Sequence, residues 1–214
     1  LTTITATQAA IEDEVRRIDI LVFTGKSGGV GGQFIEKVHA TDITYDPVSK
    51  SGTFKATVSN NARIFHILVN YDDIDGINER DILMKDENDI IPYLHVDPDN
   101  NGNVVMIYWG RMDFSVEGLP ASGAIGSVPL YRNLAMVTVE NNDTDFAVLG
   151  FSLCNYPKTS SVSPFDATAV ENPFAWNISK PTIPEAPSHT DSEYAPDMDP
   201  KYTAEYENPA GDQL

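Results

Sequence analysis

The chain has 214 residues, a hydrophobic fraction of 41% and a formal net charge of −18. A chain of this length buries roughly 70% of the surface that it exposes when unfolded, so it needs no disulfide or metal to fold. The strong negative charge repels phosphate backbones, and we therefore expect no nucleic-acid partner. No apolar run approaches the roughly 18 residues of a membrane-spanning helix, so we expect a chain that does not span a membrane.

The predicted elements, taken in chain order, are mostly β-strands. Segments with alternating or β-branched residues are separated by turn residues at 17–23, 34–38, 42–46, 52–58, 63–69, 104–109, 134–139 and 146–153. The third and fourth segments flank "PVSKS", and the last two flank "ENNDTD", so each pair predicts a hairpin. One or two short helical turns fit residues 72–85. The pattern predicts an all-β fold, an antiparallel β-sandwich of about seven or eight strands.

The composition changes near residue 180. From there the chain is rich in proline and acidic residues and poor in aliphatic ones, so this part cannot bury enough apolar area to fold alone. We therefore expect an N-terminal β-sandwich domain over residues 1–179. Residues 180–214 are predicted to be a linker, or the start of a C-terminal domain that would continue beyond Leu214.

A glycine-rich turn after the first predicted strand imitates a nucleotide-binding loop. Gly25-Lys26-Ser27 matches the end of a phosphate-binding loop, but the required first glycine would stand at the position of Ile20. Five residues, 28–32, then include four glycines, which is a poor start for a helix. The glycines are predicted to connect two strands.

A second imitation is a calcium loop. Asp97, Asp99 and Asn101 have the spacing of calcium ligands, but Tyr108 stands where the bidentate glutamate belongs. Calcium binding there is a minor alternative to a simple turn. Of the four histidines, no two have metal-ligand spacing, and His66, inside an apolar strand, is predicted to be a hydrogen-bonded core or edge residue. No catalytic constellation emerges, so we expect a binding or assembly module that is not an enzyme and has no cofactor.

Three blocks of the sequence resemble a known family. "VPLYRNLAMVTVENNDTDFAVLGFSLCNYPKTSSVSP" (128–164) is similar to the fimbrillins, the fimbrial subunit families of the Bacteroidales. The matching positions there are Leu130, Arg132, Asn133, Ala135, Val137, Val139, Phe146, Leu149, Gly150, Asn155 and Pro157. "EDEVRRIDILVF" (12–23) resembles the family's first mature strand, and "ARIFHILVN" (62–70) resembles a later strand that ends in asparagine. The blocks follow the family's order over roughly residues 10–165.

The resemblance implies a fold, a location and a function. Fimbrillins are exported through the periplasm as lipoprotein precursors to the outer membrane, and they fold as transthyretin-like sandwiches. An arginine-specific protease removes a leading strand, and a donor strand from the next subunit fills the groove. The resemblance thus implies a fimbrial (pilus) subunit in cell adhesion, whose partners are other subunits and a host or bacterial surface receptor. It places the strand-assembly edge at Ile18, Ile20 and Val22.

Two departures from the family pattern stand in the sequence. Gln8 occupies the region where the processing arginine is expected, and the nearby arginines, Arg16 and Arg17, directly adjoin the first strand. "AEYENPAGDQL" (204–214) resembles the opening of the family's second domain, but the sequence ends there, so we expect either that this domain would continue beyond Leu214 or that the subunit lacks it. The alternative to a fimbrial subunit is a secreted carbohydrate-binding β-sandwich with an aromatic platform that includes Tyr93, Tyr108 and Trp109.

Overall fold

The structure is a computed structural model of the chain. It describes residues 14–26, 32–96, 106–120, 123–132, 134–137, 139–141, 148–157, 160–165, 174, 189–196 and 201–204. Within these ranges the regular structure is mostly antiparallel β-strand with a few short helical turns. The predicted all-β, sandwich-like fold is confirmed.

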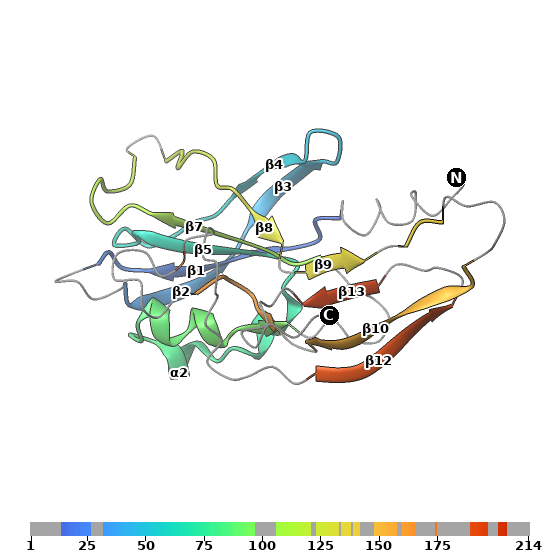
Figure 1. Ribbon diagram of the computed structural model, residues 1–214. Helices are drawn as coiled ribbons and strands as arrows, with labels where there is room; N and C mark the ends of the chain where they lie inside the picture. The colour runs from blue at the N-terminus through green and yellow to red at the C-terminus, as the bar shows by residue number, and fades with distance from the viewer. Residues whose placement is uncertain are drawn as a thin grey trace.

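A five-stranded antiparallel sheet forms the centre of the molecule (Figure 1). Its strands, in spatial order, are β2 (Phe34–His39), β1 (Ile18–Phe23), β5 (Ile64–Val69), β7 (Tyr108–Asp113) and β8 (Tyr131–Arg132). All six residues of β1 and all six of β5 are buried. A strand that is covered on both faces needs a nearly continuous apolar run rather than alternation, which explains why these two segments were easily predicted.

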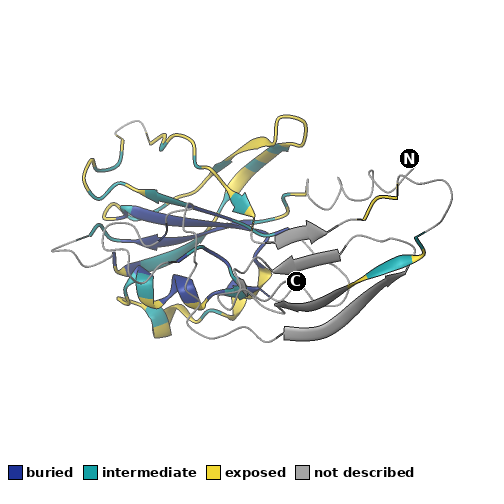
Figure 2. Ribbon diagram, in the orientation of Figure 1, coloured by how far each residue is buried: buried dark blue, intermediate teal, exposed yellow. Residues whose placement is uncertain are grey.

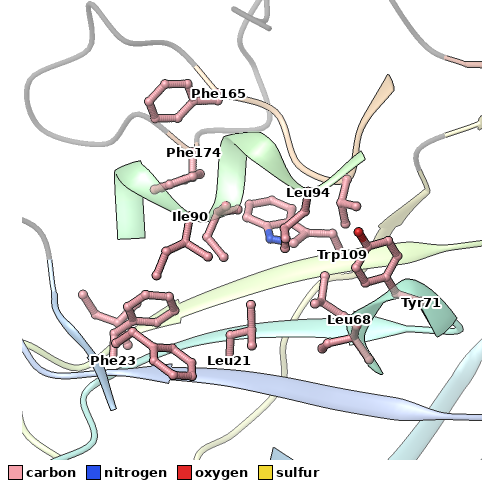
Figure 3. Close-up of a cluster of buried hydrophobic side chains, with 14 of the residues drawn as sticks. Leu21, Phe23, Leu68, Tyr71, Ile90, Leu94, Trp109, Phe165 and Phe174 are labelled. Atoms are coloured by element: carbon pink, nitrogen blue, oxygen red, sulfur yellow. The ribbon is translucent and has the colours of Figure 1, made fainter. Parts of the chain in front are cut away.

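One face of the sheet packs against short helices. These are η1 (Asp72–Gly76), α2 (Glu79–Ile82), η2 (Glu87–Asp89) and η3 (Ile91–Tyr93), so the predicted helical turns are confirmed and continue to residue 93. Leu21, Phe23 and Leu68 point from the sheet towards Ile90 and Leu94 of this cover (Figure 3). We call this side the helical face.

The opposite face is covered by a hairpin and a loop. Ile18, Ile20 and Val22 of β1 lie on this face. They pack with the β5 side chains that point away from the face of Leu68. The hairpin of β3 (Thr41–Asp46) and β4 (Ser51–Lys55) lays Ile43 and Phe54 against them. This predicted hairpin is confirmed, although β4 ends three residues before the predicted position. Its outer side is exposed (Figure 2). We call this side the hairpin face.

The remaining strands form short pairs. β6 (His95–Val96) pairs with β11 (Ser160–Ser161), β9 (Leu134–Val137) with β13 (Lys201–Ala204), and β10 (Gly150–Pro157) with β12 (His189–Pro196). Figure 1 shows β9, β10, β12 and β13 gathered at one end of the molecule. β12 and β13 both come from the proline- and acid-rich part of the chain.

Two strand predictions are wrong in detail. In the predicted hairpin of 134–139 with 146–153, the described residues 134–137 and 148–153 do not pair with each other: β9 pairs with β13 and β10 with β12, both from the C-terminal part of the chain. The local turn signal could not reveal these distant partners. The strand predicted over 104–109 runs from residue 108 to residue 113, because Arg111 and Asp113 break the apolar pattern but still lie in the ladder; residues 104–105 lie outside the described ranges.

Candidate strand-assembly site

The three residues predicted to form an assembly edge lie in the interior of the sheet. Ile18, Ile20 and Val22 are 6%, 3% and 0% exposed. β1 pairs with β2 on one side and with β5 on the other. The prediction of an edge at these residues is therefore wrong for this structure. The apolar run identified the strand correctly, but it did not show whether the strand is central or peripheral.

One outer edge of the sheet is partly covered by the chain itself. β2 is the outermost strand there, and a segment that follows α2 runs along its beginning. The Phe34 N–H donates to the Lys85 carbonyl at 2.8 Å, and the Met84 N–H donates back to the Phe34 carbonyl at 3.1 Å. The Glu87 N–H donates to the Gly32 carbonyl at 3.0 Å. This edge resists strand addition along its first residues.

The other outer edge is open over part of its length. β8 pairs with only two residues of β7, Tyr108 and Trp109. The next residue that could donate a ladder hydrogen bond to this side of β7 is Pro129, opposite Arg111. Proline has no N–H, so this bond is missing. Among the described residues, no strand pairs with this side of β7 beyond Trp109. The Phe114 N–H donates to the Arg63 carbonyl on the β5 side. Because successive residues of a strand direct their backbone groups to opposite sides, those of Arg111 and Asp113 face away from β5, towards the open edge.

The two C-terminal strands, β12 and β13, pair with β10 and β9. In the β10–β12 pair, Leu153 lies opposite Glu193 and Cys154 lies opposite Ser192. In the β9–β13 pair, Leu134 lies opposite Ala204. Each pair joins segments that are far apart in sequence. Strands that are brought together this way are held by main-chain hydrogen bonds without the constraint of a short turn. These pairs are the part of the molecule that most resembles a strand-acceptor site.

The glycine-rich turn has contacts that fit a structural role. The Lys26 N–H donates to the Ser115 Oγ at 3.1 Å, and the Lys26 Nζ lies 3.7 Å from the Asp113 carboxylate. The lysine of a phosphate loop would instead face a phosphate. Ser27 lies outside the described residues, as do the calcium candidates Asp97, Asp99 and Asn101.

The predicted aromatic platform does not form. Trp109 is only 2% exposed and belongs to the core of the helical face, whereas its neighbour Tyr108 packs on the hairpin face. Successive residues of a strand point to opposite faces, so these two rings cannot share one surface. Tyr93, at 54% exposed, stands apart on η3. That part of the carbohydrate-binding alternative is wrong.

A buried polar network crosses the helical face. His66 is completely buried, and its Nε2 lies 2.9 Å from the Glu87 Oε2. The Trp109 Nε1 donates to the His66 Nδ1 at 3.1 Å. The Arg111 Nε and Nη2 each donate to the Glu87 carboxylate at 2.9 Å. The prediction of His66 as a hydrogen-bonded core residue is confirmed.

The charges of this network shift its pKa values. Burial acts to raise the pKa of Glu87, but the hydrogen bonds from His66 and Arg111 and the charge of Arg111 outweigh it and lower this pKa to about 2. Burial lowers the pKa of His66, because the charged imidazolium would lose its water. Glu87 and Arg111 were not predicted as partners of His66. The signal that could have found them is an arginine within a buried strand, since a buried charge needs a counter-charge.

The comparisons with known proteins return no relative. No protein-family model matches the chain, and neither the curated proteins nor the solved structures include a significant match. In the part of the chain that the structure describes, no helix is both long enough and apolar enough to cross a membrane.

Proposed function

We propose that the protein is a structural subunit of a bacterial surface fimbrium, is not an enzyme, and joins its neighbours by strand exchange. The support from sequence is the resemblance of three ordered blocks to the fimbrillins. The support from geometry is one observation: β12, from the C-terminal part of the chain, lies along the whole length of β10.

Main-chain pairing makes such a strand replaceable. Hydrogen bonds between backbones do not depend on the side chains, so the same segment of a second subunit would offer β10 the same bonds. The β12 sequence, "HTDSEYAP", has two acidic residues and few aliphatic ones, so it offers little apolar area for burial. In the proposed assembly, β12 of one subunit lies on β10 of the next.

Strand exchange does not require the edge that the family resemblance placed at β1. The carbonyl of Arg17 accepts the Asn70 N–H at 3.0 Å, and the Arg17 side chain binds the Asp19 and Asp75 carboxylates. An arginine held this way is a poor substrate for a protease, which needs an extended and accessible chain. The proposal therefore moves the exchanged strand from the N-terminal to the C-terminal part of the chain. Export to the cell surface and contact with a receptor remain part of this proposal.

A disulfide between β10 and β12 tests the proposal. Cys154 is the only cysteine of the chain, and Ser192 lies directly opposite it. Opposed residues of an antiparallel pair are close enough for a disulfide. We expect Ser192→Cys, when oxidised after incubation at high concentration, to give dimers and larger species on a non-reducing gel. Each crosslink would join Cys154 of one copy to position 192 of another.

Asp191→Cys is the matched control. Residue 191 is offset by one position from the register partner of Cys154, so it should form far fewer of these crosslinks. If Ser192→Cys yields only intrachain disulfides at every concentration, then β12 stays on its own chain and the strand-exchange proposal fails.

A further inference from the structure

The environment of His66 assigns its protons. An indole Nε1 can only donate a hydrogen bond, so the His66 Nδ1 that receives it must be unprotonated. The Nε2 then carries the hydrogen and donates it to Glu87. The network is thus complete only while the imidazole is neutral, and it has no place for a second proton on His66.

A second proton on His66 would place two hydrogen-bond donors opposite each other. Protonated Nδ1 would face the N–H of Trp109, and a buried donor left without a partner is costly. The charged groups around the ring are Glu87 from η2 and Arg111 and Asp113 from β7. Phe23 of β1 and Phe174 contribute only ring contacts, with centroids 5.4 Å and 4.9 Å from the imidazole. Burial, together with the charge of Arg111, outweighs the Glu87 and Asp113 carboxylates, so the pKa of His66 is lowered.

Glu87 links this ring to the cover of the helical face. Its carboxylate receives His66 and Arg111 from the sheet, while its own N–H donates to the Gly32 carbonyl beside β2. Phe174 also rests on the network, with its ring 5.5 Å from the Arg111 guanidinium carbon. A rearrangement at His66 therefore acts directly on η2 and on Phe174.

We propose that His66 is an acid-sensitive latch: protonation of its Nδ1 breaks the bond from Trp109 and loosens η2, η3 and Phe174 from the sheet. The latch does not rest on the proposed strand exchange, because the residues argued for it lie on β5, β7 and η2. The β-sheet itself stays paired when the latch opens, since the apolar clusters on both faces do not titrate.

The sign of the pH effect follows from burial. Burial lowers the pKa of His66 from its ordinary value of about 6.5. As the pH falls below that value, the unfolded or opened state takes up the proton first. The latch is therefore closed at neutral pH and opens on the acid side. Between the pKa of the open state and that of the closed state, each pH unit lowered raises the open population about tenfold.

Two complementary histidine variants isolate the latch. The chain has four histidines, so a variant with His39, His95 and His189 changed to Gln keeps only His66. His66→Gln keeps the other three, and its amide can still accept from Trp109 and donate to Glu87. Trp176→Phe in both backgrounds leaves Trp109 as the only tryptophan, so its fluorescence reports on the ring beside His66.

We expect the His66-only variant to show a reversible emission change between pH 7.5 and 5, and His66→Gln to show none. Hydrogen exchange, corrected for its intrinsic pH dependence, should accelerate about tenfold or more over residues 87–94 of the wild type, with β1 and β5 unchanged. An emission change that persists in His66→Gln overturns the proposal. So does a wild-type protein whose residues 87–94 exchange equally at both pH values, and that measurement needs no variant to fold.

Discussion

The five-stranded sheet and the terminal strand pairs are built on different principles. β1 and β5 are buried along their whole length between two apolar clusters. β10 and β12 instead join two segments from distant parts of the chain in a two-stranded pairing. An isolated two-stranded pair is marginal on its own. The difference indicates that the sheet supplies most of the stability, and it supports the proposal that the terminal pairs exchange their partners.

The largest expected effect is at Glu87. Glu87→Ala leaves the Arg111 guanidinium without its counter-charge and the His66 N–H without an acceptor. Removing one partner of a buried ion pair typically costs about 3–5 kcal/mol, and we expect a loss of that size in urea unfolding. Asp113→Asn is the control, because its carboxylate is 26% exposed. A loss at Glu87 no larger than the loss at Asp113 would show that the network does not stabilise the sheet.

A smaller loss of stability is expected at Gly110, where residues 128–130 pack closely against β7. A Cβ on Gly110 would lie 2.7 Å from the Pro129 carbonyl oxygen and 2.9 Å from side-chain atoms of Val128 and Leu130. Gly110→Ala should lower the free energy of unfolding by about 1–3 kcal/mol through overpacking. Gly76→Ala is the matched control, since no atom lies within 4 Å of its Cβ position. Equal effects in urea unfolding would contradict the close packing at Gly110.

Acid should weaken the sheet through the same carboxylate. The pKa of Glu87 is about 2 in the folded state against an ordinary value of 4.5, so the unfolded chain binds the proton first as the pH falls. The stabilisation is complete above about pH 4.5 and is lost as the pH drops towards 2. Urea unfolding between pH 5 and pH 2.5 should show this decline. Glu87→Gln should have a flatter profile, and an unchanged slope in that variant would rule out Glu87 as the source.

The smallest effect on global stability is expected in β12. Alternate residues of a strand face each neighbour, so either Ser192→Pro or Glu193→Pro removes an N–H that donates to β10. One lost hydrogen bond costs about 0.5–1.5 kcal/mol, and we expect the loss to stay local. Hydrogen exchange should accelerate in β10 while β1 and β5 keep their protection. Loss of protection in β5 would show that the pairs and the sheet unfold together.

The sequence predicted the sheet better than the terminal pairs for a physical reason. β1, β5 and the β3–β4 hairpin carry their signals locally, as apolar runs or as a turn between two strands. The partners of β9 and β10 depend on contacts between distant segments, which no local pattern records. The sequence could not show that Ile18 lies in a central strand for the same reason, because the neighbours of a strand depend on the whole fold. His66 could be placed in the core from its apolar strand, but Glu87 and Arg111 meet it only through folding.

The most direct test of strand exchange uses two chains with one cysteine each, so that neither chain can form an intrachain disulfide. Wild-type protein offers Cys154, and an isotopically heavy Cys154→Ser, Ser192→Cys variant offers only the opposite position of the β10–β12 pair. The two are mixed, concentrated and oxidised, and the disulfide-linked products are weighed by mass spectrometry.

Strand exchange predicts that the mixed light–heavy disulfide dominates over both homodimers and that it falls sharply when the heavy partner carries Asp191→Cys in place of Ser192→Cys. A mixed disulfide no more abundant with position 192 than with position 191 would contradict exchange of β12, and with it the central claim that this strand joins one subunit to the next.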